Sequence, residues 1–192
     1  KLGAKPLLAY TLDTLIELAD SPQEIIVISD DDEILDFAMT YNITTIKEEK
    51  TTGKATLDDV CLKVLKSLSS KIKPEDLFIT IQATCPFVKK ETILKAKEIL
   101  AGGFSSVITA TDDRHLSWGL NAKNEPTPNY KKRLNRQDLP PHFKESGAVI
   151  GSHISAITEN KTRINSPIKL LPITKEEGLD IDDFNDWAMS GS

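Results

Sequence analysis

The chain is poor in the residues from which disulfide frameworks and zinc sites are built. It has only two cysteines in 192 residues, Cys61 and Cys85, and three histidines. The cysteines lie far apart in dissimilar settings, and no Cys or His spacing typical of a metal site is present. These absences exclude a disulfide-stapled secreted domain and a zinc-binding module, and they favour a reduced, cytoplasmic protein.

The sequence also lacks a basic excess and any long apolar run. Its formal net charge is −5 at pH 7, whereas proteins that bind nucleic acid or membrane surfaces usually carry a positive excess. No apolar run approaches the length of a membrane span. We therefore expect neither a nucleic-acid partner nor a membrane partner. With 39% hydrophobic residues, the chain suits a single globular domain over residues 1–192.

What the chain does contain is a regular alternation of helix and strand patterns. Apolar residues recur at helical spacing in four segments, with strand-like apolar runs between them (helical 6–19, 32–41, 56–68 and 91–100; strand-like 24–29, 43–46, 77–82 and 106–110). This order predicts an α/β protein with a mostly parallel sheet and helices on both faces. In the second helix we expect Ile34, Phe37, Ala38 and Tyr41 to face inward. Cys61 lies on the apolar stripe of the third, where we expect a core residue.

A polar, proline-bearing and basic stretch interrupts the alternation between Asp112 and Lys144. A stretch of this length is typical of a functional or subunit-contact element rather than of a plain connection. We therefore interpret residues around 112–150 as an excursion of the same domain, with a functional or dimerisation role. Short strand-like runs return at 149–150 and 168–173.

Two aspartates near the end of the sequence, Asp180 and Asp182, are the strongest candidates for chemistry. On an extended segment their carboxylates project from the same face, because side chains alternate with a period of two. Two close carboxylates repel each other unless a cation lies between them, and hard oxygen ligands suit Mg²⁺. The alternative is an acidic cap on a last helix, with Asp183 as the capping residue.

Polar groups also follow other predicted strands, where ligands of open α/β sheets bind. The Asp30–Asp31 pair follows one strand, and the segment 82–86 follows another. The Gln82 amide has a donor and an acceptor, which suits the edge of a nucleotide base. Structural alternatives are a helix cap at Asp30 or Asp31 and a plain turn after Gln82.

The excursion contributes Arg136, whose guanidinium can bind a carboxylate through two parallel hydrogen bonds. The alternative is a solvated basic loop, because Lys131–Arg133 lies nearby. The three histidines are isolated from one another, and we expect surface or packing roles for them.

Several of these segments together resemble one enzyme family. The runs are KPLLAYT (5–11), IVISDD (26–31), QATCP (82–86), RQDLP (136–140) and DID (180–182). They occur in the order seen in acylneuraminate cytidylyltransferases, the CMP-sialic acid synthetases, and the resemblance covers nearly the whole chain. It implies a three-layer, Rossmann-like nucleotidyltransferase fold and, usually, a homodimer. It also implies that CTP reacts with a nine-carbon 2-keto sugar acid to give the CMP-sugar and pyrophosphate, with Mg²⁺.

The resemblance also implies roles for individual residues. By position, it assigns Thr56, Gln82 and Thr84 to the nucleotide, Arg136, Gln137, Asp138 and Ser146 to the sugar acid, and Asp180 and Asp182 to Mg²⁺. Of these, Arg136, Asp180 and Asp182 are expected to take part in catalysis.

This sequence departs from the family pattern at several positions. Ser146 stands where the family usually has an asparagine that contacts the sugar, Ile150 where an aromatic residue is common, and Cys85 where serine is usual. The family's opening strand and its Arg- and Lys-bearing phosphate loop have no counterpart, and we expect the protein to be longer than this chain. Alternatives are the same reaction on pseudaminic or legionaminic acid, a nucleotidyltransferase acting on a sugar phosphate, and a non-catalytic nucleotide-binding module.

Overall fold

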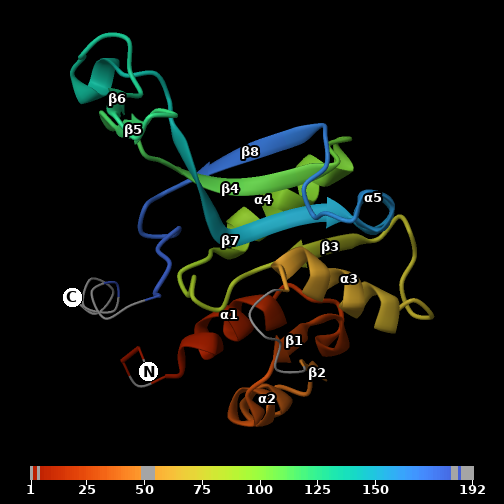
Figure 1. Ribbon diagram of the computed structural model, residues 1–192. Coiled ribbons are helices and arrows are strands. Elements are labelled where there is room, and N and C mark those ends of the chain that lie inside the picture. Colours follow the sequence, from red (N-terminus) through yellow and green to blue (C-terminus); the bar gives the residue numbers. More distant parts are fainter. Residues whose placement is uncertain (1, 4, 49–54, 183–185, 187–192) are drawn as a thin grey trace.

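Helices and strands alternate along the chain in the computed structural model, which describes residues 2–3, 5–48, 55–182 and 186 (Figure 1). In chain order the elements are α1 (Leu7–Ile16), η1 (Pro22–Glu24), β1 (Ile26–Ser29), α2 (Asp32–Met39), β2 (Thr44–Lys47), α3 (Leu57–Ser67), β3 (Leu77–Thr80), α4 (Lys90–Ala101), β4 (Ser106–Asp112), β5 (Trp118–Leu120), β6 (Pro126–Pro128), η2 (Arg136–Asp138), β7 (Phe143–His153), α5 (Ile154–Asn160) and β8 (Ile168–Ile173). None of the helices in these ranges combines the length and the apolar character that crossing a bilayer requires.

The strands form a mixed set of sheets. β1 and β2 pair in parallel, and β5 pairs with β6 as an antiparallel hairpin. The central sheet has the order β3-β7-β4-β8. Strands β3 and β4 are both antiparallel to β7, and β8 is parallel to β4. Three of its four strands therefore share one direction, as predicted, whereas β7 runs against them.

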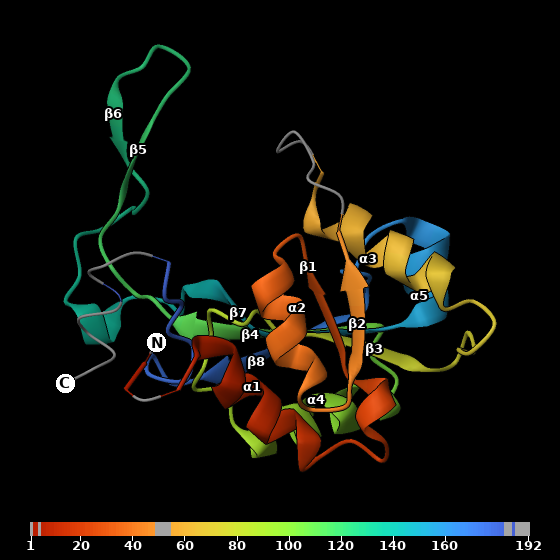
Figure 2. The ribbon, with the colours of Figure 1, turned by 90° about the horizontal axis from the view of Figure 1, so that it is seen from below.

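Helices cover both faces of the central sheet, which confirms the layered α/β arrangement. On one face α4 packs through Ile93, Ala96 and Leu100 into a core cluster, to which Leu15 of α1 and Leu18, just after that helix, also belong. On the other face α3 and α5 share a second cluster around Leu65 and Ile157. The two sets of helices are seen on opposite sides of the sheet in Figure 2.

The second helix, α2, begins where the sequence predicts but buries a partly different face. The Asp31 carboxylate accepts hydrogen bonds from the backbone N–H groups of Glu33 at 2.8 Å and Ile34 at 3.4 Å, so Asp31 is its N-cap. Leu35 and Ala38 are buried, whereas Ile34 is 43% exposed. The expectation that Ile34 faces inward was therefore wrong, and the next residue, Leu35, is buried instead.

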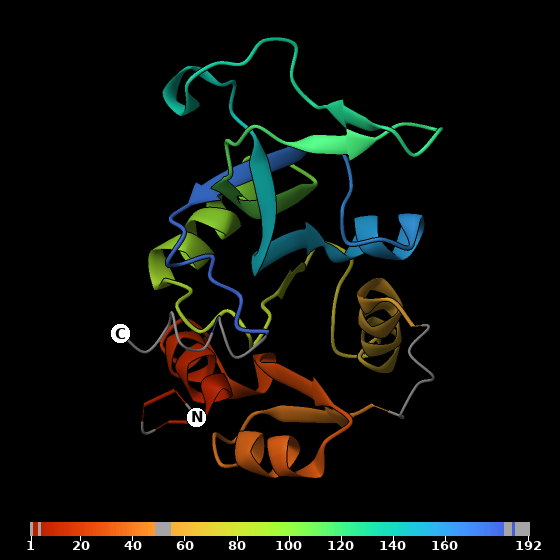
Figure 3. The same cartoon turned by 60° about the vertical axis from the view of Figure 1, so that its left-hand side comes forward.

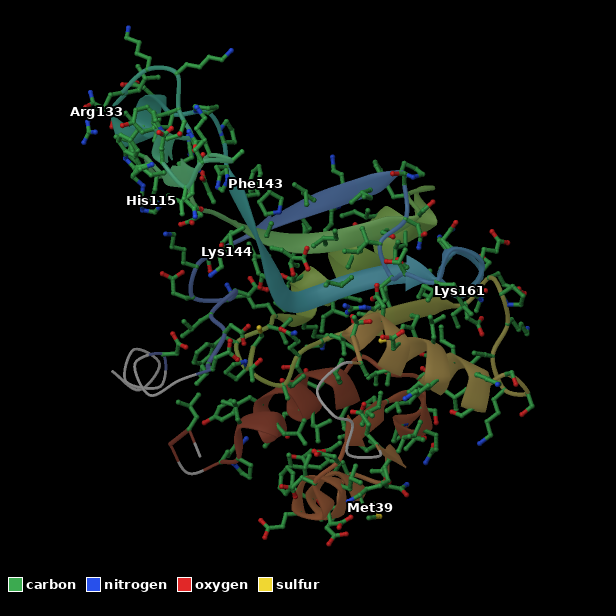
Figure 4. The ribbon with its side chains drawn as sticks, viewed as in Figure 1. Met39, His115, Arg133, Phe143, Lys144 and Lys161 are labelled. Atoms are coloured by element: carbon green, nitrogen blue, oxygen red, sulfur yellow. The ribbon has the colours of Figure 1, made fainter. Side chains whose placement is uncertain are left out.

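Residues 113–142, which we call the arm, extend from the body of the molecule (Figures 2 and 3). The arm carries the β5–β6 hairpin, in which the rings of Trp118 and Tyr130 meet edge to face with centroids 6.0 Å apart. His115 and Arg133 lie on the arm, and Phe143 and Lys144 lie at its base (Figure 4). There β7 begins, six residues earlier than the predicted run at 149–150.

Candidate active site

A pocket of about 200 Å³ lies where α3 begins, β3 ends and β7 passes between β3 and β4. We call it the central pocket. Its walls are formed by Leu57, Thr80, Gln82, Glu145, Gly147, Ile150, Arg163 and Asp180. Two residues that the sequence singled out, Gln82 and Asp180, thus meet in one cavity although they are almost a hundred positions apart.

An irregularity in β7 shapes the floor of this pocket. The β4–β7 register places Ile108 opposite Ile150 but Ala110 opposite Glu145, so β7 carries extra residues between these pairs. The buried Thr109 hydroxyl replaces the missing ladder contacts, because it accepts from the N–H of Val149 at 2.9 Å. Bulges of this kind redirect a strand and are common beside functional sites.

The bulge brings Gly147 directly against Gln82. The backbone N–H of Gln82 donates to the Gly147 carbonyl at 3.0 Å. A Cβ atom at position 147 would lie only 1.7 Å from Gln82 Oε1. Glycine is therefore the residue that leaves room for the Gln82 side chain as it lies in the pocket.

Residues 180–182, which we call the acidic segment, lie beside the loop that follows β3. The N–H of Ile181 donates to the Thr84 carbonyl at 2.9 Å, and the Ile181 side chain is buried. Asp180 on one side of Ile181 is half-buried, and Asp182 on the other is exposed. The two aspartates thus flank a buried residue, and the expectation that their carboxylates project from the same face stays a prediction. The capping alternative involves Asp183, which lies outside the described residues.

The carboxylate of Asp180 fits a cation. Its Oδ1 atom is buried and has no hydrogen-bond partner among the described residues, a costly arrangement for a polar atom. Burial, with the negative charges of Asp180 and Asp182, raises the pKa of the Cys85 thiol to about 12. No group of three His, Cys, Asp or Glu side chains in the described ranges is arranged to hold a metal ion. Two carboxylates are nevertheless enough for Mg²⁺, which completes its shell with phosphate oxygens and water.

Glu177 anchors the segment that carries the two aspartates, and sequence reasoning missed it. Its carboxylate is buried and accepts hydrogen bonds from the backbone N–H of Lys89 at 3.1 Å and from the Thr92 hydroxyl. These groups lie in the first turn of α4, whose N-cap residue Lys89 makes no side-chain capping bond. A negative charge is favourable at a helix N-terminus, so Glu177 caps α4 from a distant part of the chain.

Replacing Glu177 with alanine is expected to destabilise the protein and loosen residues 174–182. Loss of the cap costs about 1–2 kcal/mol, which corresponds to a fall in Tm of roughly 2–8 °C for a chain of this size. Calorimetry measures the first effect, and amide hydrogen exchange of the segment measures the second. The matched control is Glu176→Ala, at an exposed neighbour. Equal Tm and exchange in the two variants would show that Glu177 anchors nothing.

Three residues assigned to the ligands lie beside the central pocket rather than in its walls. Thr56 is the N-cap of α3, where its hydroxyl accepts from the N–H of Asp59 at 3.2 Å, and the next residue, Leu57, reaches the pocket. Thr84 offers its carbonyl to the acidic segment. Ser146 is buried, and its hydroxyl accepts from the N–H of Ala148 at 3.2 Å. Their ligand roles stay predictions.

Arg136 and Gln137 lie in a second pocket of about 490 Å³, which we call the lateral pocket. Its walls are formed by Asp112, Arg114, Arg136, Gln137, Ile173, Thr174 and Lys175. The structure therefore does not bring Arg136 into the central pocket of the same chain, and Asp138 is in the wall of neither pocket. The two pockets lie at opposite ends of the segment from Thr174 to Asp180. Carboxylate binding by Arg136 stays a prediction, and the lateral pocket is where it would act.

Arg163, in the wall of the central pocket, is a second residue that sequence reasoning missed. Its guanidinium Nε donates to Asp58 Oδ1 at 2.6 Å, and its Nη1 donates to the Thr80 hydroxyl at 3.0 Å. Asp58 and Arg163 are 105 positions apart, and neither belongs to a recognisable motif. No local signal in the sequence could have paired them.

Two curated relatives are similar to nearly the whole chain. A CMP-N,N'-diacetyllegionaminic acid synthase of Legionella pneumophila is 28% identical over 201 residues, covering 98% of this chain and 85% of that protein. An N-acylneuraminate cytidylyltransferase of Streptococcus agalactiae serotype V is 26% identical over 195 residues. That alignment covers 97% of this chain but only 46% of the streptococcal protein, so the chain spans about half its length.

Solved structures confirm the fold, and a family model confirms the resemblance seen in the sequence. A 4-diphosphocytidyl-2C-methyl-D-erythritol synthase from Anaerococcus prevotii superposes with a TM-score of 0.68 at 18% identity, covering 100% of this chain and 86% of that one. A second synthase of that name gives a TM-score of 0.69 at 14% identity, covering 98% and 90%. Both have the Rossmann-like nucleotidyltransferase fold. The cytidylyltransferase family model matches residues 1–181. This chain therefore belongs to the cytidylyltransferase family.

Proposed function

We propose that this protein activates a nine-carbon 2-keto sugar acid with CTP, giving the CMP-sugar and pyrophosphate. One observation carries the proposal: Gln82, a candidate for reading a base, and Asp180, a carboxylate suited to a cation, face the same pocket in a cytidylyltransferase. The names of both curated relatives, a legionaminic acid synthase and an acylneuraminate cytidylyltransferase, support a sugar acid as the second substrate.

The residues of the central pocket suit this reaction by binding and positioning. The sugar's anomeric hydroxyl oxygen loses its proton to solvent and forms a bond to the α-phosphorus. The bond from that phosphorus to the oxygen that bridges it to the β-phosphorus breaks, and pyrophosphate leaves with that oxygen. Catalysis of such a transfer is mainly positioning and charge neutralisation. Asp180 and Asp182 would hold Mg²⁺, which supplies positive charge to the phosphate oxygens. The Gln82 amide would orient the ligand from the end of β3.

A homodimer built through the arm is part of the proposal. Trp118 is 57% exposed and Leu120 is 68% exposed on the hairpin that extends from the body. Exposed apolar side chains on such an element suit contact with a second copy of the chain. Light scattering of the full-length protein should give twice the monomer mass, and Leu120→Asp should shift it towards the monomer. A monomeric wild-type protein would refute this part.

The test of the proposed function is pyrophosphate release by the full-length protein with CTP and Mg²⁺. Sialic, legionaminic and pseudaminic acids are offered separately, and ATP, GTP and UTP replace CTP in parallel reactions. We expect release with CTP and at least one sugar acid. Calorimetric binding of CTP without turnover of any acid would support a non-catalytic module instead. Turnover with a sugar phosphate alone would support a different nucleotidyltransferase.

Among the nine-carbon sugar acids, two observations favour legionaminic acid over sialic acid as the substrate. Ser146 and Ile150 replace the family's usual asparagine and aromatic residue beside the central pocket, and the Legionella relative is a legionaminic acid synthase. The same panel decides between the acids, since the better substrate has the higher kcat/KM.

A further inference from the structure

Arg163 is a cation in the wall of the central pocket to which the proposed reaction gives no role. It lies in the loop between α5 and β8, and its side chain is only 12% exposed. Its guanidinium is held by Asp58 from α3 and by Thr80 at the end of β3. Both contacts come from elements that form the pocket, so the charge is fixed at the cavity wall.

A network of hydrogen bonds fixes both ends of this arginine. The Thr162 hydroxyl donates to Asp58 Oδ2 at 2.9 Å, which orients the carboxylate that holds Arg163. The backbone carbonyl of Arg163 accepts from the buried hydroxyls of Ser106, at 3.2 Å, and Ser152. Burial raises the pKa of the Asp58 carboxyl, but the hydrogen bonds from Arg163 and Thr162 and the charge of Arg163 outweigh burial and lower it overall. The Asp58 carboxyl therefore stays ionised at neutral pH.

The guanidinium retains hydrogen-bonding capacity after these contacts. It has five N–H donors and no acceptor, and the described residues provide acceptors for Nε and Nη1. A largely buried cation with donors left at a cavity wall is well suited to bind an oxygen acceptor on a ligand. Because its position is already fixed, little conformational entropy is lost when the ligand binds.

We propose that Arg163 is a specificity-determining residue that donates hydrogen bonds to an acceptor oxygen on a substituent of the sugar acid. This inference rests on the proposed function. A sugar acid is anionic and rich in carbonyl and hydroxyl oxygens, so a fixed cation complements it. Cytosine and ribose are neutral, and in the proposed function the triphosphate charge would be neutralised by Mg²⁺ at Asp180 and Asp182. Thr80, which holds the guanidinium, is the last residue of β3, lies two positions before Gln82 and pairs with Ile150 of β7.

A site of this kind discriminates strongly between substrates. An analogue that lacks the acceptor leaves the remaining N–H donors of the guanidinium without a partner, and a site built around a hydrogen bond rejects such analogues far more strongly than an apolar pocket does. The acceptor is most simply an acyl carbonyl, because acyl groups distinguish one sugar acid from another.

The test is Arg163→Met in the full-length protein, assayed by pyrophosphate release. We expect KM for the best sugar acid to rise by about 10- to 100-fold, the loss typical of a hydrogen bond to a charged group, with KM for CTP within about twofold. A de-acylated form of that acid should lose a similar factor with the wild-type protein and almost none with Arg163→Met. A purely structural role for Arg163 would not remove this discrimination.

Matched variants keep the test decisive. Lys66→Met removes one positive charge from an exposed position on α3 and should leave both KM values unchanged. If Arg163→Met does not fold, Arg163→Lys carries the test, since it keeps the charge but loses the planar fork, and we expect the same split in KM. An unchanged KM for the sugar acid, or a rise in KM for CTP instead, overturns the inference. Failure of the wild-type protein to use any sugar acid refutes the proposed function itself.

Discussion

Replacing Asp180 with asparagine is expected to lower kcat/KM for pyrophosphate release by about 10²- to 10³-fold. Asp180 has a buried carboxylate oxygen without a hydrogen-bond partner among the described residues, in the wall of the pocket that Gln82 shares. A metal ion that neutralises phosphate charge contributes several kcal/mol to the transition state, and each 1.36 kcal/mol is a factor of about ten. Asparagine keeps the shape of the side chain but loses the charge that would hold Mg²⁺.

Thermal stability provides a readout of the same site that does not depend on turnover. In EDTA, Asp180→Asn should be at least as stable as the wild type. The substitution removes the negative charge of a carboxylate whose Oδ1 atom is buried without a hydrogen-bond partner among the described residues. On addition of Mg²⁺ and CTP the wild-type Tm should rise, because a ligand that binds the folded state stabilises it. The variant should show little of this rise.

Two further variants define the outcome for the metal site. Asp182→Asn should behave like Asp180→Asn in activity, since both carboxylates flank the buried Ile181. Asp36→Asn, at an exposed position on α2, is the control and should match the wild type. If Asp180→Asn and Asp182→Asn both retain most activity, or if activity persists in EDTA, the proposed Mg²⁺ site is wrong.

Gly147→Ala is expected to lower kcat/KM by about 10²-fold while the protein remains folded. The added Cβ would lie 1.7 Å from Oε1 and 2.5 Å from Cδ of Gln82. These atoms are the end of a flexible side chain next to a pocket, so Gln82 moves and the backbone stays. Misplacement of a positioning group by about 1 Å can cost about 10²-fold in rate. Calorimetry should show only a small change in Tm.

A double-mutant cycle tests this explanation directly. If Gly147→Ala acts by displacing Gln82, then Gln82→Ala alone should lose a similar factor, and the double variant should lose little more. Gly102→Ala, at the C-cap of α4, is the glycine control, because its Cβ would meet only backbone oxygens of Ile99 and Glu98 and no residue of the central pocket. Fully additive losses would mean that Gly147 acts independently of Gln82.

Much of the secondary structure was predictable because its signals are local. Thr56 and Asp59 form a capping box, so α3 begins where the sequence indicates. Asp31 likewise caps α2. The run at 168–173 is β8 in the structure. Each signal acts within a few residues, where helix capping and apolar spacing operate.

The direction of β7 and its bulge could not be predicted, because they depend on two neighbouring strands. The sequence shows a short apolar run at 149–150, but the strand extends from Phe143 to His153. Its early residues, from Phe143 to Glu145, are exposed and carry no apolar pattern. Pairing with β4, and the Thr109 hydroxyl that bridges the bulge, supply what the local sequence lacks.

By itself, the sequence determined the α/β class, the positions of most helices and strands, and the pairing of Asp180 and Asp182 as a candidate cation site. These features follow from the spacing of residues along the chain. Local backbone geometry determines which residues share one face of a helix or strand and where each element ends. Only the tertiary structure decided that Gly147 makes room for Gln82, that Glu177 caps α4, that Asp58 holds Arg163 in the pocket wall, and that Arg136 lies in a separate pocket. Those contacts join residues far apart in sequence, and burial in the folded core selects them rather than any local preference.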